Sequence, residues 1–183
     1  MNVGVGVIGA GTVGGGVIDI LLDNTGVIED KTGVQVTLKH VAELRSELLK
    51  DFQLDGVRVS GDAADLIADP EVNVVCELIG GVGAARKLIL DALNAGKHVV
   101  TANKMLLAKH GPELNEAALR NGVELRFEAA VAGAVPIIKA IRESLAANHI
   151  HSVYGILNGT CNYILSRMTY EGLAFGDALA QAQ

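Results

Sequence analysis

The sequence predicts an α/β fold built on a doubly wound parallel sheet, and three observations support that prediction. Short apolar runs rich in β-branched residues recur along the chain, and stretches with helical spacing separate them. The first run, Val3–Ile8, is followed directly by a glycine-rich turn and then by a helical pattern. Strand, turn and helix repeated in this order are typical of a parallel sheet with helices on both faces.

Hydrophobic periodicity gives the place of each element. Strands are expected over residues 3–8, 34–42, 72–79, 98–101 and 123–127. Helices are expected over residues 13–22, 63–68, 84–95 and 113–120. Gly96 closes the third helix. Pro112 is expected to begin the fourth helix. Proline has no backbone N–H group, but an N–H group in the first turn of a helix has no carbonyl partner within the helix, so nothing is lost there.

The turn between the first strand and the first helix has the pattern GxGxxG, formed by Gly9, Ala10, Gly11, Thr12, Val13 and Gly14. In this context the first glycine takes the tight turn, the second lets backbone amides approach a pyrophosphate, and the third lets helix and strand pack closely. The amino end of the helix then faces the phosphates. These six residues are therefore predicted to bind the cofactor in a Rossmann-type dinucleotide-binding domain.

Glu43, at the end of the second strand, is the residue expected to bind the adenosine ribose. Its distance from the glycines exceeds the usual spacing of about 20 residues, because residues 27–33 lengthen the first crossover. Arg45 could instead meet the 2′-phosphate of NADP. Glu43 favours NAD slightly, and the alternative that both residues are solvated surface charges stays open.

The character of the chain changes after Glu128, where residues 129–135 are a run of small side chains. We place a domain boundary there, giving a dinucleotide-binding domain over 1–130 and a second domain over 131–183. In the second, a helix is expected over 136–147, a strand over 149–157, a helix over 161–168 and the start of another at Phe175. Because that last helix has no stop signal, residues 131–183 are expected to be an incomplete α+β substrate and dimerisation domain.

Composition argues against several other classes of protein. The formal net charge is −6 and there is no long basic run, so nucleic acid is not expected as a partner. Cys76 and Cys161 show no metal-ligand spacing, which disfavours a disulfide scaffold or a zinc site and favours a cytoplasmic location. Every apolar stretch approaching about 18 residues is interrupted by glycine, so no membrane span is expected.

Five motifs in a fixed order resemble those of a known family. They are GAGTVG at 9–14, ELIGG at 77–81, TANK at 101–104, EAAVAG at 128–133 and GILNGTCNYIL at 155–165. Together they closely resemble homoserine dehydrogenase over essentially the whole chain. The resemblance implies reversible hydride transfer between NAD(P)H and L-aspartate 4-semialdehyde, giving L-homoserine, in threonine, methionine and isoleucine synthesis. It also implies a homodimer of the full-length protein.

Lys104 is the residue at which the fold argument and the resemblance agree. It follows the expected strand 98–101, at the carboxyl edge of the sheet, where ligands of open α/β folds bind. An ammonium group there can bind a substrate carboxylate or stabilise the alkoxide that develops as hydride reaches an aldehyde carbon. We therefore expect Lys104 to be catalytic and to lie beside the cofactor.

The resemblance also assigns residues near the second domain. Gly159 and Thr160 are implied to border the homoserine site, and the Thr160 hydroxyl can cap the following helix. Backbone carbonyls are implied to bind a monovalent cation such as Na⁺ at Glu128, Val131, Gly133 and Val135. A domain hinge without an ion is the alternative. The substrate-binding carboxylates and a second, acid/base lysine are implied to follow residue 183, so this chain alone is expected to be inactive.

Two other functions stay open. A non-catalytic NAD-sensing module would keep the same glycine pattern, but its full-length protein would bind nucleotide without turnover. Another semialdehyde or dihydrodipicolinate-type oxidoreductase would share the fold. That neighbouring family usually needs an active-site cysteine or a His-rich loop, and neither lies at a predicted strand end in this sequence.

Overall fold

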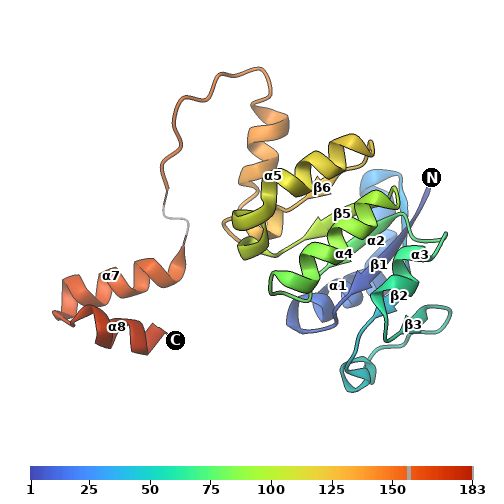
Figure 1. Ribbon diagram of the computed structural model, residues 1–183, viewed down its shortest axis with the longest axis horizontal. Coiled ribbons are helices and arrows are strands. Elements are labelled where there is room, and N and C mark those ends of the chain that lie inside the picture. The colour runs from blue at the N-terminus through green and yellow to red at the C-terminus, as the bar shows by residue number, and fades with distance from the viewer. Residues whose placement is uncertain (156–157, 183) are drawn as a thin grey trace. The chain divides into compact units, whose positions relative to one another are not determined.

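The computed structural model describes residues 1–155 and 158–182 (Figure 1). The chain forms two compact units, Met1–Ala130 and Val131–Gln183. Within the described ranges, no helix is both long enough and apolar enough to cross a membrane.

The first unit is built on a six-stranded sheet in which all neighbouring strands are parallel. The strands are β1 (Asn2–Ile8), β2 (Gln35–Ala42), β3 (Arg58–Ser60), β4 (Val74–Glu77), β5 (His98–Thr101) and β6 (Leu125–Arg126). Their spatial order is β3-β2-β1-β4-β5-β6. This is the Rossmann order, in which ligands bind where the order reverses, here between β1 and β4. The predicted α/β, doubly wound parallel sheet is confirmed.

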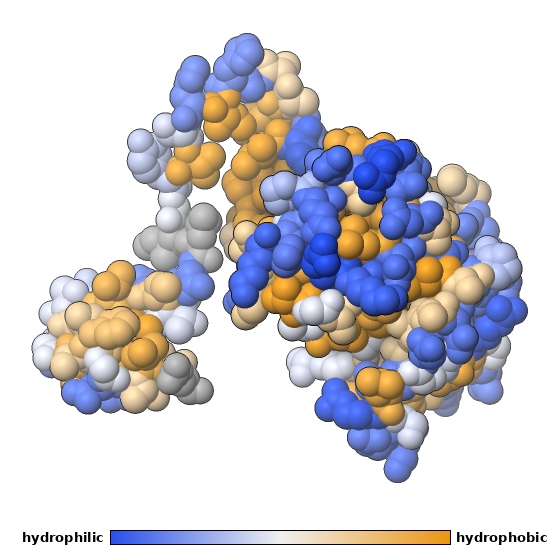
Figure 2. Space-filling model, viewed as in Figure 1, coloured by the Kyte–Doolittle hydropathy of each residue, from blue (hydrophilic) through white to orange (hydrophobic). Residues whose placement is uncertain are grey.

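Helices cover both faces of this sheet. They are α1 (Thr12–Asp23), α2 (Thr25–Thr32), α3 (Ala63–Ala68), α4 (Gly83–Asn94) and α5 (Lys104–Arg120), with short 3₁₀ turns η1 (Ser46–Leu49) and η2 (Glu128–Ala130). One buried cluster joins the sheet to α3, α4 and α5, and a second joins it to α1 and η1. Because strand side chains alternate between faces, Val7 belongs to the second cluster and its neighbour Ile8 to the first. Figure 1 shows α4 and α5 side by side, and their visible face is largely hydrophilic (Figure 2).

The fourth helix of the first unit begins earlier than the sequence pattern predicts. Pro112 does not open it but lies inside α5, which starts at Lys104. Asn103 supplies the start signal, because its Oδ1 accepts a hydrogen bond from the N–H of Leu106 at 3.1 Å. An interior proline destabilises a helix by about 3 kcal/mol, but α5 is also held by Leu106 and Leu114, which come before and after Pro112 in the sequence and are buried in the core.

In the second unit, α6 (Ile137–Lys139) continues as a π-helical turn η3 (Ala140–Ser144), and α7 (Gly159–Glu171) packs against α8 (Phe175–Ala182). The predicted helix over 136–147 is therefore shorter, whereas the one over 161–168 is confirmed within α7. The predicted strand over 149–157 is wrong for residues 149–155, which are not in a strand and are exposed. A strand is stable only when neighbours pair with it. Ile156 and Leu157 lie outside the described residues.

Candidate functional site

The glycine turn has the geometry that its pattern predicts. Gly9 follows β1 with φ +93°, a conformation that L side chains rarely adopt, and its N–H donates to the carbonyl oxygen of Ala42 at 2.9 Å. A Cβ on Gly14 would lie 1.8 Å from the carbonyl oxygen of Gly9. Gly11 precedes α1, and a Cβ there would meet no atom within 4 Å. The tight turn therefore requires Gly9, and the close packing of α1 on it requires Gly14. The Cβ position of Gly11 faces open space.

That open space is a cavity of about 490 Å³ over the carboxyl ends of β1, β2 and β4. Its wall is formed by Ile8, Gly9, Gly11, Ala42, Glu43, Leu44, Arg45, Gly61, Asp62, Ala63, Leu78, Ile79, Ala84 and Leu88. Most of these residues are apolar, with the charged side chains at the ends of β2 and β3. A largely apolar cavity with a few charged groups beside a helix amino terminus suits a nucleotide.

Glu43 lies in this wall with its carboxyl group bonded to the glycine turn. Oε2 accepts the N–H of Ala10 at 2.6 Å, Oε1 accepts the N–H of Arg45 at 2.9 Å, and Arg45 Nε lies 3.6 Å from Oε1. Burial alone would raise the pKa of Glu43, but the two backbone hydrogen bonds and the charge of Arg45 outweigh it and lower the pKa below 4.5. With 7% of its side chain exposed, Glu43 is not a solvated surface charge.

The other charges at this end of the cavity are more exposed. The side chain of Arg45 is 63% exposed. Asp62 caps α3, because its Oδ1 accepts the N–H of Ala64 at 2.8 Å. The end of the cavity beside β2 and β3 therefore carries one guanidinium group and two carboxyl groups.

Lys104 is the first residue of α5, and α5 begins three residues after β5 ends. Its N–H donates to the carbonyl oxygen of Ala102 at 3.1 Å, and its side chain is exposed. A second cavity, of about 150 Å³, is lined by Val13, Glu77, Leu78, Gly80, Ala102 and Asn103. The structure thus brings the start of α1 and the residues just before Lys104 to one cavity, although Lys104 itself is not in its wall.

Sequence reasoning missed the role of the polar residues at the ends of β4 and β5 and just before Lys104. Glu77 and Thr101 end β4 and β5 and are both completely buried, and Asn103 caps α5. The available signal was an acidic residue closing an apolar strand just before Gly80 and Gly81.

Gly159 and Thr160 form the exposed first turn of α7. The expected cap by Thr160 is wrong, because Thr160 already lies inside the helix. Asn158 is the cap, and its Oδ1 accepts the N–H of Cys161 at 2.8 Å. The assignment of Gly159 and Thr160 to the substrate site stays a prediction.

The residues assigned to a cation follow one another in the chain. Glu128 begins η2, and Val131, Gly133 and Val135 alternate with Ala132 (φ +47°) and Ala134 (φ +67°), which is uncommon for residues other than glycine. The carbonyl oxygen of Val135 accepts the N–H of Ile137 at 2.8 Å. No group of three or more His, Cys, Asp and Glu side chains that could bind a metal occurs in residues 1–155 and 158–182. The cation therefore stays a prediction.

Two family models match the chain. The model described as "Homoserine dehydrogenase, NAD binding domain" matches residues 9–128, and the one described as "Homoserine dehydrogenase" matches residues 136–183. The chain belongs to the homoserine dehydrogenase family. The first match covers every residue of the larger cavity's wall except Ile8, so the first unit is the NAD(P)-binding domain of this family of oxidoreductases.

Proteins named homoserine dehydrogenase are similar to essentially the whole chain. The one from Neisseria gonorrhoeae is 46% identical over 99% of this chain and 41% of the relative. The one from Synechocystis is 44% identical over 100% and 42%. A crystal structure of a homoserine dehydrogenase from Thiobacillus denitrificans has a TM-score of 0.88 at 45% identity and covers 100% of this chain and 42% of its own. The chain thus spans about two fifths of the length of these members of the homoserine dehydrogenase family.

Proposed function

We propose that the protein to which this chain belongs is an NAD(P)-dependent homoserine dehydrogenase. It transfers hydride reversibly between L-homoserine and L-aspartate 4-semialdehyde in the cytoplasm, in the synthesis of threonine, methionine and isoleucine, and acts as a homodimer. One observation supports this most strongly: in a chain of this family, Gly11 opens onto a cavity of about 490 Å³ at the point where the strand order reverses.

The cofactor would lie along the carboxyl edge of the sheet. Its pyrophosphate would face the amino end of α1 beside Gly11, where backbone N–H groups and the helix dipole favour negative charge. Its adenosine would lie by Glu43 and Asp62, and its nicotinamide would point toward the second cavity, between Val13 and Asn103. The ionised, buried carboxylate of Glu43 would repel a 2′-phosphate, so NAD is preferred over NADP.

When bound, NAD(P)H would supply the hydride for the aldehyde carbon and become NAD(P)⁺, and the aldehyde oxygen would take up a proton from the acid/base lysine that the resemblance implies after residue 183. Lys104 is the cation nearest in sequence to the wall of the second cavity. Its exposed ammonium binds the substrate and stabilises the negative charge that grows on the aldehyde oxygen. Gly159 and Thr160 border the substrate, and a Na⁺ ion is bound mainly by backbone carbonyls at Glu128, Val131, Gly133 and Val135.

The direct test of this role replaces Lys104 in the full-length enzyme. Lys104→Ala should lower kcat for homoserine oxidation by about 100- to 1000-fold, because the developing oxyanion loses its partner, while the dissociation constant of NADH changes little. Lys109→Ala, which removes an exposed lysine of the same helix, is the matched control and should keep native kinetics. Absorbance at the nicotinamide band gives kcat, and calorimetric titration gives the dissociation constant.

Each alternative gives its own result. If Lys104→Ala keeps its turnover but loses NADH affinity, Lys104 is a cofactor ligand and its catalytic role is contradicted. A full-length protein that binds NADH and turns over no homoserine would instead be a sensor module. The 183-residue chain alone should bind NADH and show no homoserine oxidation.

A further inference from the structure

A buried carboxyl group lies under the edge of the sheet where the proposed reaction takes place. Glu77 is the last residue of β4 and is 0% exposed. Burial of an acidic side chain is costly unless its oxygens find partners. Both do, because Oε1 accepts the N–H of Ile79 at 3.0 Å and Oε2 accepts the hydroxyl of Thr101 at 2.7 Å.

Thr101 extends this link from β4 to the loop that follows β5. It lies beside Glu77 in the parallel pairing of the two strands and is also 0% exposed. Its hydroxyl oxygen, which donates its proton to Glu77, accepts the N–H of Asn103 at 3.0 Å. One hydroxyl group therefore connects the end of β4 to the residue that caps α5.

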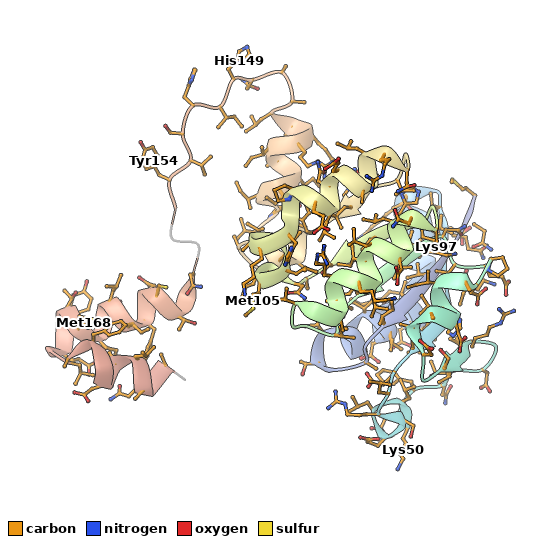
Figure 3. All side chains as sticks on the ribbon, viewed as in Figure 1. Lys50, Lys97, Met105, His149, Tyr154 and Met168 are labelled. Atoms are coloured by element: carbon orange, nitrogen blue, oxygen red, sulfur yellow. The ribbon has the colours of Figure 1, made fainter. Side chains whose placement is uncertain are left out.

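Asn103 makes two further hydrogen bonds that fix the start of α5. Its Oδ1 accepts the N–H of Leu106 at 3.1 Å, and its Nδ2 donates to the carbonyl oxygen of Gly81 at 2.6 Å. Lys104 is the next residue, and Met105, labelled in Figure 3, marks the same first turn of the helix. The backbone of Lys104 is therefore held by bonds that begin at Glu77.

The same residues face the cofactor side of the sheet. Glu77 and Asn103 line the cavity of about 150 Å³ together with Val13, which belongs to the first turn of α1. The hydrogen-bonded chain thus lies between the glycine turn and Lys104. Fully partnered buried polar networks of this kind hold their members in one arrangement.

We propose that Glu77 is a positioning residue for Lys104. Through its hydrogen bond to Thr101, and through Asn103, Glu77 fixes the position at which α5 begins. It thereby fixes the position of the Lys104 ammonium group relative to the cofactor. This inference rests on the proposed function of Lys104. Both carboxylate oxygens of Glu77 are bonded within the protein, so Glu77 acts through Lys104, and loss of the network should change turnover more than cofactor affinity.

The test removes the shared hydroxyl with Thr101→Val in the full-length enzyme. We expect kcat for homoserine oxidation to fall by about 10- to 100-fold, the effect of displacing a catalytic group by about 1 Å, while NADH affinity stays near native. The double variant Thr101→Val/Lys104→Ala should be no slower than Lys104→Ala alone, because the network acts through that lysine. Thr101→Ala, which removes the same hydroxyl without putting a methyl group in its place, gives the same test if Thr101→Val does not fold.

Asn121→Ala is the matched control, because it removes side-chain hydrogen bonds at the other end of α5. Asn121 Nδ2 donates to the carbonyl oxygen of Ala117 at 2.9 Å and to Asn94 Oδ1 at 3.1 Å. This variant should lose stability and keep native kcat. If Thr101→Val also loses only stability, or if its effect multiplies with that of Lys104→Ala, the positioning role is overturned.

A measurement without turnover separates this inference from the proposed function. After reductive ¹³C-methylation, the NMR resonance of Lys104, assigned with Lys104→Arg, should move in Thr101→Val and not in Asn121→Ala. An unchanged resonance overturns the positioning role even if Lys104 is catalytic. A shifted resonance, in an enzyme whose Lys104→Ala variant keeps full turnover, supports the positioning and contradicts the catalytic role of Lys104.

Discussion

The carboxyl group of Glu43 is hydrogen-bonded within the protein and could still accept hydrogen bonds from a ligand. Its two carboxylate oxygens accept the backbone N–H groups of Ala10 and Arg45, and each oxygen has lone pairs left for a ribose hydroxyl. The same bonds lower its pKa, so the group is negatively charged at neutral pH. We therefore expect the charge of Glu43, as well as its hydrogen bonds, to favour NAD over NADP.

This charge can be tested with Glu43→Gln. The neutral amide no longer repels a 2′-phosphate, so the ratio of NADPH to NADH affinity should rise by at least about tenfold, given the strength of charge pairs near a protein surface. Calorimetric titrations of the chain with both nucleotides measure the ratio. Arg45→Ala should shift it the other way. An unchanged ratio in Glu43→Gln would show that the carboxylate does not select the cofactor.

Asp69 makes the stability of the first unit depend on pH. Burial alone would raise the pKa of Asp69, but the N–H of Glu71, the ring of His40 and the charge of Arg58 outweigh it and hold the pKa below 3.8. A lowered folded-state pKa gives stability that is present above the unfolded pKa and is lost as the pH falls through the folded value.

Asp69→Asn should therefore cost about 1.5–3 kcal/mol at pH 7, as expected for hydrogen bonds to a charged group. It should also flatten the loss of stability below about pH 4. Urea unfolding between pH 3 and pH 7 measures both effects, with Asp65→Asn, an exposed carboxylate on α3, as control. Equal acid sensitivity in native and Asp69→Asn chains would contradict this assignment.

At the level of the elements, the glycines of α1 differ in how closely other atoms pack against them. Gly14 lies against the glycine turn, whereas a Cβ on Gly16 would meet nothing within 4 Å. Close packing therefore does not explain Gly16, and the structure offers no other reason for it.

Gly16→Ala should stabilise the chain by about 0.5–1 kcal/mol, because alanine loses less backbone entropy in a helix. Gly14→Ala should destabilise it, since the new Cβ would collide with the carbonyl oxygen of Gly9. The midpoints of urea unfolding give the comparison. A Gly16→Ala chain that is less stable than the native one would reveal a contact or strain not seen in α1.

The elements that could be predicted are those with strong apolar periodicity. Buried residues recur at strand or helix spacing in β1, β2, β4, β5 and α4. The predicted bounds of these five elements lie close to the observed ones. β3 has three residues with no buried position, and α2 has no buried residue, so neither leaves such a pattern. Residues 149–155 of the strand predicted at 149–157 show the opposite error, since an alternating pattern does not supply a pairing partner.

At the scale of the whole molecule, the sequence predicts which strand ends are followed by candidate functional residues. It does not predict the hydrogen bonds that connect these strand ends. The glycine pattern predicted the turn that lies beside the larger cavity. Lys104 was predicted to lie at the carboxyl edge of the sheet because it follows the strand over residues 98–101. The link from Glu77 through Thr101 to Asn103 depends on residues far apart in sequence, which only the parallel pairing of β4 and β5 brings together.

We propose above all that the first unit binds a dinucleotide against Gly11, and this can be tested by calorimetric titration of the chain with NADH. Gly11 has φ −66°, which any residue adopts, and open space at its Cβ position. Gly11→Val should therefore keep the native melting temperature but lose NADH affinity by about 100-fold, or roughly 2.7 kcal/mol. Gly16→Ala, the matched glycine variant outside the cavity, should bind as the native chain does. If Gly11→Val binds NADH with native affinity, the dinucleotide does not lie against this turn.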